Sequence, residues 1–136
     1  MRTVLTVGVF DLLHYGHYEL FRRAKELAGH NGKLIVAIQE DEFVTKYKPE
    51  TKLFYDWNKR AQMISALRYV DEVVPYSDID ISIRKIKFDI FAIGGDQVYS
   101  GFQKAVEWCK KMGKEIIRLP RTEGISSSEI RKGNLC

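Results

Sequence analysis

Five short apolar runs recur along the chain, and each has about the length of one β-strand. They cover residues 3–8, 33–38, 71–75, 88–93 and 115–119. Several are apolar at nearly every position, which is typical of strands that are covered on both faces. Helical periodicity separates the runs, as at Leu20, Ala24 and Leu27. This alternation predicts an α/β fold in one domain over residues 1–136, with a five-stranded parallel sheet and helices on both faces.

The composition argues against several classes of protein. The chain has 22 basic and 18 acidic residues spread along its length, whereas a nucleic-acid binder more often concentrates its basic residues in a stripe. No apolar run approaches the roughly 18 residues of a membrane-spanning helix, and the first residues lack a secretory signal pattern. Cys109 and Cys136 are isolated and lack the spacing of metal ligands. We therefore expect a cytoplasmic protein that binds neither nucleic acid nor membrane.

One connection is long for a compact domain. Residues 39–55 carry several lysines and show little periodicity, and long irregular connections are more often functional lids than simple links. A helical pattern follows, from Ala61 to Leu67. Because Arg60 and Arg68 are separated by a little over two helical turns, we expect them to share one face of this helix, where they could converge on an anion.

The first run is followed by a candidate phosphate site. The strand breaks at Gly8 and a helix begins near Gly16, so the first N–H groups of the helix and its dipole would favour a phosphate. His14 and His17 lie at the same end, where an imidazole can donate to a phosphate oxygen and its charge would stabilise an anion. A single histidine there would more often be a cap, but two of them behind a strand break indicate a functional site.

A second candidate phosphate site lies near the C-terminus. Ser126 and Glu129 have the spacing of a helix capping box, which needs only one hydroxyl. Here three consecutive serines follow Gly124 and Arg121. Hydroxyls, backbone N–H groups and a guanidinium at a helix start can bind a second part of a polyphosphate.

Two carboxylates lie where the strands are expected to end. Asp96 follows two glycines after the fourth run, where it could contact a ribose or an amino group. Asp11 follows the first run and could hold Mg²⁺ through water. One carboxylate does not define a metal site, so the metal ligands stay unassigned.

Four motifs occur in order across nearly the whole chain. Residues 14–17 read His-Tyr-Gly-His, and Gly-Val-Phe-Asp precedes them at 8–11. Residues 68–73 read Arg-Tyr-Val-Asp-Glu-Val, and residues 121–127 read Arg-Thr-Glu-Gly-Ile-Ser-Ser. With these motifs the chain resembles the cytidylyltransferases of the H-x-G-H nucleotidyltransferase superfamily, most of all the bacterial glycerol-3-phosphate enzymes. The resemblance implies a Rossmann-like domain.

The resemblance also implies roles for particular residues. Catalytic roles fall on His14, His17, Lys46 and Arg121, with Lys46 reaching the α-phosphate from a mobile loop. Acceptor contacts fall on Lys46, Arg60 and Arg68, and Asp71 falls at a position of structural contacts. Nucleotide contacts fall on Gly8, Val9, Phe10, Asp11, Gly16, Gly94, Asp96, Arg121, Thr122, Gly124, Ile125, Ser126 and Ser127.

The implied reaction transfers CMP from CTP to a small phosphomonoester and releases pyrophosphate. A phosphomonoester is largely dianionic near neutral pH, so it can attack the α-phosphorus directly, without a covalent enzyme intermediate. The family uses Mg²⁺, held mainly by the nucleotide phosphates, and is typically dimeric, so a homodimer is implied. Its products serve the synthesis of surface polysaccharides or lipid headgroups.

Two departures from the family pattern leave the acceptor open. The glycerol-3-phosphate enzymes have threonine where this chain has Val9, and tryptophan where it has Gln97. Glycerol 3-phosphate is therefore not assigned as the acceptor. Two other functions stay open at this point: an adenylyltransferase of the same superfamily, and a nucleotide-binding module that does not catalyse.

Overall fold

A computed structural model describes residues 2–94 and 100–119, and it contains a five-stranded sheet. The strands are β1 (Thr3–Gly8), β2 (Lys33–Gln39), β3 (Glu72–Tyr76), β4 (Ile90–Gly94) and β5 (Glu115–Leu119). Their order is β3-β2-β1-β4-β5, and every neighbouring pair is parallel. The prediction of a parallel five-stranded sheet is confirmed.

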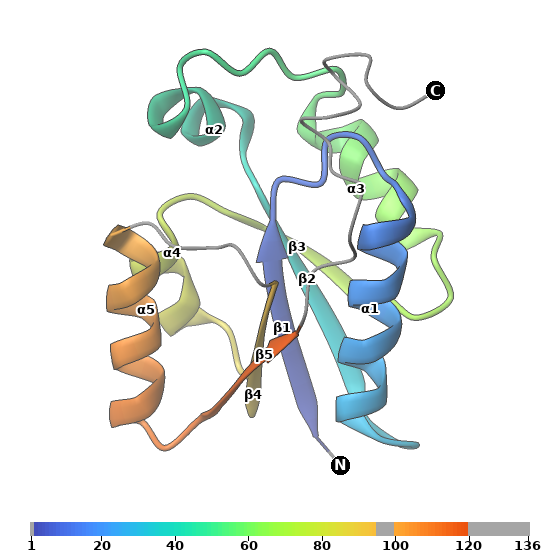
Figure 1. Cartoon of the computed structure of the whole chain (residues 1–136), viewed down its shortest axis with the longest axis vertical. Helices are drawn as coiled ribbons and strands as arrows, with labels where there is room; N and C mark the ends of the chain where they lie inside the picture. The colour runs from blue at the N-terminus through green and yellow to red at the C-terminus, as the bar shows by residue number, and fades with distance from the viewer. Residues whose placement is uncertain (1, 95–99, 120–136) are drawn as a thin grey trace.

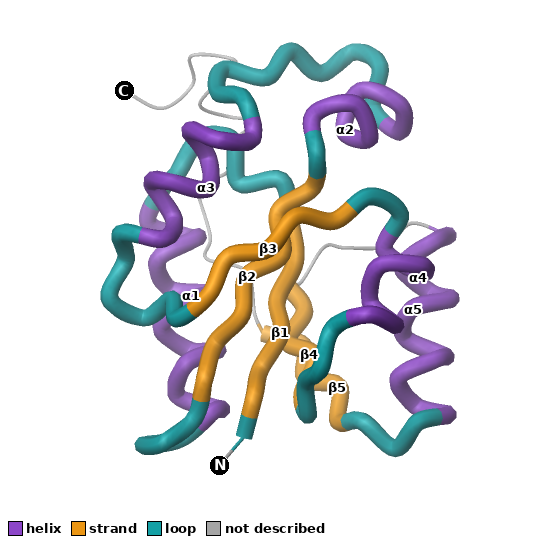
Figure 2. Tube along the Cα trace, turned by 180° about the vertical axis from the view of Figure 1, so that it is seen from behind, coloured by secondary structure: helices purple, strands orange, loops and turns teal. Residues whose placement is uncertain are grey.

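Helices cover both faces of this sheet, as predicted (Figure 1). They are α1 (Tyr15–Ala28), α2 (Asp41–Tyr47), α3 (Trp57–Ser65), α4 (Ile79–Ser82), the 3₁₀ turn η1 (Ile83–Lys85) and α5 (Ser100–Lys111). Figures 1 and 2 show α1 and α3 on one face and α4 and α5 on the other, with α2 beyond the end of β2. No helix within residues 2–94 and 100–119 is long and apolar enough to cross a membrane.

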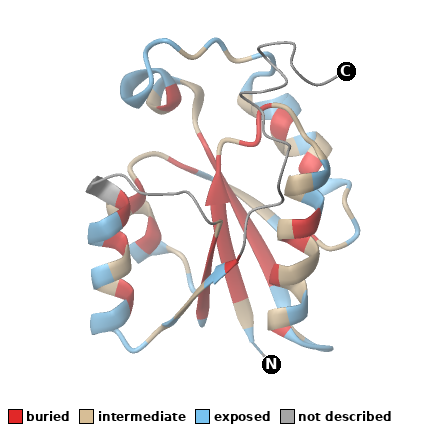
Figure 3. Cartoon of the chain, viewed as in Figure 1, coloured by how far each residue is buried: buried red, intermediate tan, exposed pale blue. Residues whose placement is uncertain are grey.

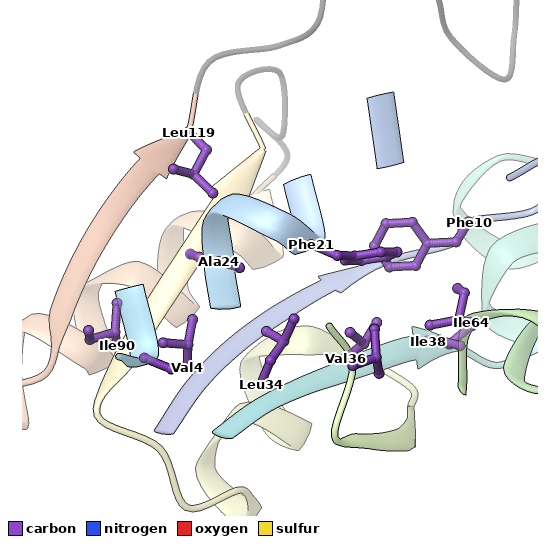
Figure 4. Packing of buried hydrophobic residues seen from close by; sticks show 13 residues of the cluster. Val4, Phe10, Phe21, Ala24, Leu34, Val36, Ile38, Ile64, Ile90 and Leu119 are labelled. Atoms are coloured by element: carbon purple, nitrogen blue, oxygen red, sulfur yellow. The ribbon is translucent and has the colours of Figure 1, made fainter. Parts of the chain in front are cut away.

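The sheet separates two hydrophobic clusters. On one side Phe21 and Ala24 of α1 belong to one cluster with Val4 of β1 and Val36 of β2 (Figure 4). On the other side Phe91 of β4 packs with Phe102 of α5. Figure 3 shows that burial is concentrated on the strands and on the helix sides that face them. Covering on both faces explains why the apolar runs in the sequence hardly alternate.

Two sequence interpretations about the middle of the chain are wrong. Residues 39–55 are not wholly irregular, because α2 forms within them; Val44 is its only buried residue, so no periodic pattern marks the helix. The following helix α3 ends at Ser65, and Arg68 lies beyond it in a turn. Leu67 nevertheless packs against the core, which is why its spacing resembles that of a longer helix.

The topology places a switch point at the carboxyl ends of two neighbouring strands. β1 leads to α1 on one face, whereas β4 leads toward α5 on the opposite face. The register pairs Val4 with Ile90, and Gly8 and Gly94 are the last residues of these two neighbouring strands. Ligands of open parallel sheets bind in the crevice at such a point.

Gly8 is required by the turn that follows β1. Phe10 has a φ of 52°, an unusual value for a bulky residue, and its ring folds back over Gly8. A Cβ on Gly8 would lie 2.7 Å from the tip of this ring. The ring cannot easily move, because it packs edge-on against Phe21 and His17, each with centroids 5.1 Å away.

Substituting Gly8 by alanine should therefore destabilise the fold. We expect Gly8→Ala to lower the free energy of unfolding by about 1–3 kcal/mol, the usual cost of overpacking a confined site. The measurement is urea unfolding followed by circular dichroism. Gly94→Ala is the matched control, because Gly94 also ends its strand and an added Cβ there would have no neighbour within 4 Å among the described residues. Equal unfolding midpoints for the two variants would contradict this account of the turn.

Candidate active site

His14 and His17 form a reciprocal cap at the start of α1. His14 is the N-cap residue, and its Nδ1 accepts a hydrogen bond of 3.0 Å from the Gly16 N–H. His17 Nδ1 in turn accepts from the His14 N–H at 3.3 Å. This is the geometry of a capping box, with imidazoles in place of the usual hydroxyl and carboxylate. The histidines therefore use the Gly16 N–H, one of the first helix N–H groups that the sequence interpretation offered to a phosphate, and the N–H of the N-cap residue itself.

The cap determines which ring nitrogen can donate. A neutral imidazole carries its proton on only one nitrogen, and Nδ1 is the acceptor in both rings. The proton therefore belongs on Nε2 in His14 and in His17. The rings stack with centroids 3.8 Å apart and planes 21° apart. The stacking holds two Nε2–H groups close together at the N-terminus of α1.

The environment of His17 favours its neutral form. Burial of the ring, and then the charge that a protonated His14 would place beside it, lower the pKa of His17 to about 3. Protonation would also convert Nδ1 from an acceptor into a donor and break the cap. At neutral pH His17 therefore offers an N–H donor without a full positive charge, whereas the sequence interpretation had a charged imidazole stabilise the anion.

Asp11 anchors a neighbouring segment to this turn. Its side chain is buried, and its two oxygens accept from the backbone N–H groups of Phe54 and Tyr55, both at 2.9 Å. The sequence interpretation gave this carboxylate to the nucleotide or to Mg²⁺. Both of its oxygens instead accept hydrogen bonds that hold the connection between α2 and α3. Within residues 2–94 and 100–119, no group of three or more histidine, cysteine or acidic side chains could hold a metal ion.

Arg60 is a buried residue of α3. Its guanidinium donates to the carbonyl oxygens of Val9 at 2.8 Å and Tyr55 at 3.2 Å, and it forms an ion pair with Asp41. Its side chain has no exposed surface, whereas Arg68 is exposed. The structure therefore does not bring the two arginines onto one helix face, and the expected convergence on an anion is wrong.

Lys46 lies in the last turn of α2, not in an irregular loop as expected. The side chain is exposed, and Nζ lies 5.6 Å from the ring centroid of Phe43 and 5.3 Å from that of Tyr47. Figure 2 shows α2 beyond the carboxyl end of β2, at the edge of the sheet where β1 also ends. Lys46 is thus a cation on the candidate-site side of the sheet.

Asp71 has the structural role that the resemblance implied. Its Oδ2 accepts from the Leu34 N–H at 2.7 Å and from Lys25 Nζ at 2.6 Å, which ties the start of β2 to α1. Burial alone would raise the pKa of this carboxyl, but the two hydrogen bonds outweigh burial and lower it.

Several expected site residues lie outside the described part of the chain. These are Asp96, Arg121, Thr122, Gly124, Ile125, Ser126 and Ser127. The described residues bring His14, His17 and Gly16 to the edge of the sheet where Gly8 and Gly94 end their strands. Asp41, which pairs with Arg60, was missed, because neither its spacing nor a motif marks it in the sequence.

Comparisons with known proteins agree with this arrangement. The family model described as "Cytidylyltransferase-like" matches residues 5–133. The glycerol-3-phosphate cytidylyltransferase of Staphylococcus aureus is 40% identical over 97% of this chain and 94% of its own length. That of Bacillus subtilis is 37% identical over 97% of this chain and 96% of its own length. The FAD synthase of Korarchaeum cryptofilum is 37% identical over 95% and 88% of the two chains.

A solved structure supports the same fold. The lipopolysaccharide core biosynthesis protein from Thermoplasma volcanium superposes with a TM-score of 0.70 at 27% identity. The match covers 90% of this chain and 97% of that one. Fold, histidine cap and relatives agree: the chain belongs to the cytidylyltransferase-like family and is a Rossmann-like nucleotidyltransferase of the cytidylyltransferase type.

Proposed function

We propose that the protein transfers CMP from CTP to a small phosphomonoester, which yields a CDP-linked product and pyrophosphate. The observation that carries this proposal is the pair of Nε2–H groups that the reciprocal cap holds at the switch point of the sheet. The glycerol-3-phosphate cytidylyltransferases among the relatives support CTP as the donor nucleotide. The FAD synthases, which are adenylyltransferases, are matched at similar identity and make ATP the second candidate.

The proposed reaction depends on positioning the substrates and on stabilising charge more than on acid–base catalysis. The acceptor phosphate is already a nucleophile, so the enzyme has to align it with the α-phosphorus and stabilise the charge that develops. His14 and His17 would donate Nε2–H bonds to phosphate oxygens. Because His17 is neutral, positive charge would come from Lys46 and from Arg121 instead.

Mg²⁺ would accompany the nucleotide and not occupy a prepared protein site. The described residues offer no cluster of candidate ligands, and both oxygens of Asp11 already accept backbone hydrogen bonds. Such an ion usually keeps phosphate oxygens and waters as ligands. The homodimer implied by the family resemblance also stays a prediction.

A pyrophosphate-release assay tests the proposed reaction. We expect release with CTP and Mg²⁺ that depends on an acceptor from a panel of glycerol, choline, ethanolamine and amino-acid-derived phosphates. Release with CTP should exceed release with ATP. Faster release with ATP would favour the adenylyltransferase, whereas nucleotide binding without release across the panel would favour a non-catalytic module.

A substitution at His17 can separate its donor role from its capping role. Glutamine at this position can still accept from the His14 N–H, as it does in other capping boxes, but its remaining N–H donors belong to a flexible amide and are not held in place by a stacked ring. We expect His17→Gln to keep the thermal midpoint near that of the wild type and to lower kcat by roughly 10²–10³-fold, the scale for losing one preorganised donor. His17→Ala should lower both quantities.

His30→Gln is the matched control, because His30 is exposed in the turn after α1. It should leave both the thermal midpoint and kcat unchanged. Wild-type kcat in His17→Gln would remove His17 from the proposed mechanism.

A further inference from the structure

Lys46 depends on a lightly anchored helix for its position. α2 has seven residues, and Val44 is the only one that is buried. The side chain of the N-cap residue Glu40 makes no capping hydrogen bond. Burial of one valine holds a short helix weakly, so the polar contacts at its first residue, Asp41, matter for where the helix lies.

Asp41 connects this helix to the rest of the site. One carboxylate oxygen pairs with the Arg60 guanidinium, and the other accepts from the Trp57 N–H at 3.3 Å. Arg60 also donates to the carbonyl of Val9, in the turn that leads to His14. A single buried guanidinium therefore bridges the helix that carries Lys46 and the turn that carries the histidines.

The two partners of this ion pair differ in burial, and the difference indicates which partner holds the other in place. The side chain of Arg60 is fully buried, whereas that of Asp41 is 45% exposed. A buried guanidinium needs partners for its N–H groups, and two of its partners here are fixed carbonyls. Arg60 is thus held in place by the backbone, and its attraction for the Asp41 carboxylate draws the start of α2 toward the guanidinium.

We propose that Asp41 and Arg60 are positioning residues that set the location of Lys46 relative to His14 and His17. They act through α2 and do not contact substrate. This inference rests on the proposed nucleotidyl transfer, in which Lys46 supplies positive charge. It replaces the acceptor-binding role that the sequence assigned to Arg60.

The primary test removes the charge of Asp41 and keeps its shape. Asp41→Asn should lower kcat by about tenfold to a hundredfold, because small misplacements of a charged group are costly in this kind of catalysis. KM for the nucleotide should change much less, since the histidine cap is untouched. Glu42→Gln is the matched control: it makes the same charge change on the next residue of α2, whose side chain is exposed, and should leave kcat unchanged.

A double-mutant cycle separates positioning from general damage to the fold. If Asp41 acts through Lys46, then Asp41→Asn should cost less than about twofold in kcat when Lys46 is already alanine. A merely structural effect would lower kcat by the same factor in both backgrounds. Equal factors, or equal kcat for Asp41→Asn and Glu42→Gln, would overturn the inference.

Hydrogen exchange tests the placement of α2 without any assay of activity. Asp41→Asn should speed exchange at the Thr45–Lys48 amides by at least about fivefold, whereas Glu42→Gln should not. Unchanged exchange would contradict the positioning role even if kcat fell. Faster exchange in a protein that releases no pyrophosphate would leave the positioning of α2 intact and reject the proposed reaction instead.

Discussion

Two imidazole nitrogens stand where a hydroxyl and a carboxylate usually cap a helix, and the candidate site depends on this cap. By accepting from the Gly16 and His14 N–H groups, the two Nδ1 atoms cap the start of α1 and leave the ring proton of each neutral imidazole on Nε2. The cap thus uses Nδ1 of each ring, and the proposed phosphate contacts would use Nε2. Protonation of His17 would break the cap. The positive charge that stabilises phosphate oxygens therefore has to come from other residues.

A second set of contacts joins the turn after β1 to the segments around it. Asp11 ties the turn after β1 to Phe54 and Tyr55, and Arg60 ties Val9 to Asp41. Both are charged residues whose hydrogen-bonding groups face the backbone or a partner side chain. The contacts of Asp11 and the ion pair of Arg60 with Asp41 thus join segments of the chain to one another. Lys46, in contrast, is exposed at the edge of the candidate site.

The sheet could be predicted from sequence because burial on both faces leaves a direct mark, a run of consecutive apolar residues such as 88–93. The position of the two histidines at a helix start could be predicted as well, since a strand break, two histidines and a helix start are local features. Helix α2 could not be predicted, because a single buried valine produces no repeating pattern of apolar residues in the sequence. The ion pair between Arg60 and Asp41 could not be predicted either, because it joins residues 19 positions apart through packing that no local pattern encodes.

The most direct test of the histidine cap is ¹⁵N NMR of the imidazole side chains over a pH titration. The cap predicts that His14 and His17 are Nε2–H tautomers at neutral pH, and that His17 stays neutral down to pH values well below its ordinary pKa of 6.5. The exposed His30 gives the third imidazole signal in the same spectra and serves as the reference for assigning the other two. A proton on Nδ1 of His17 at neutral pH, or a His17 titration near 6.5, would contradict the cap and the neutral-donor role that follows from it.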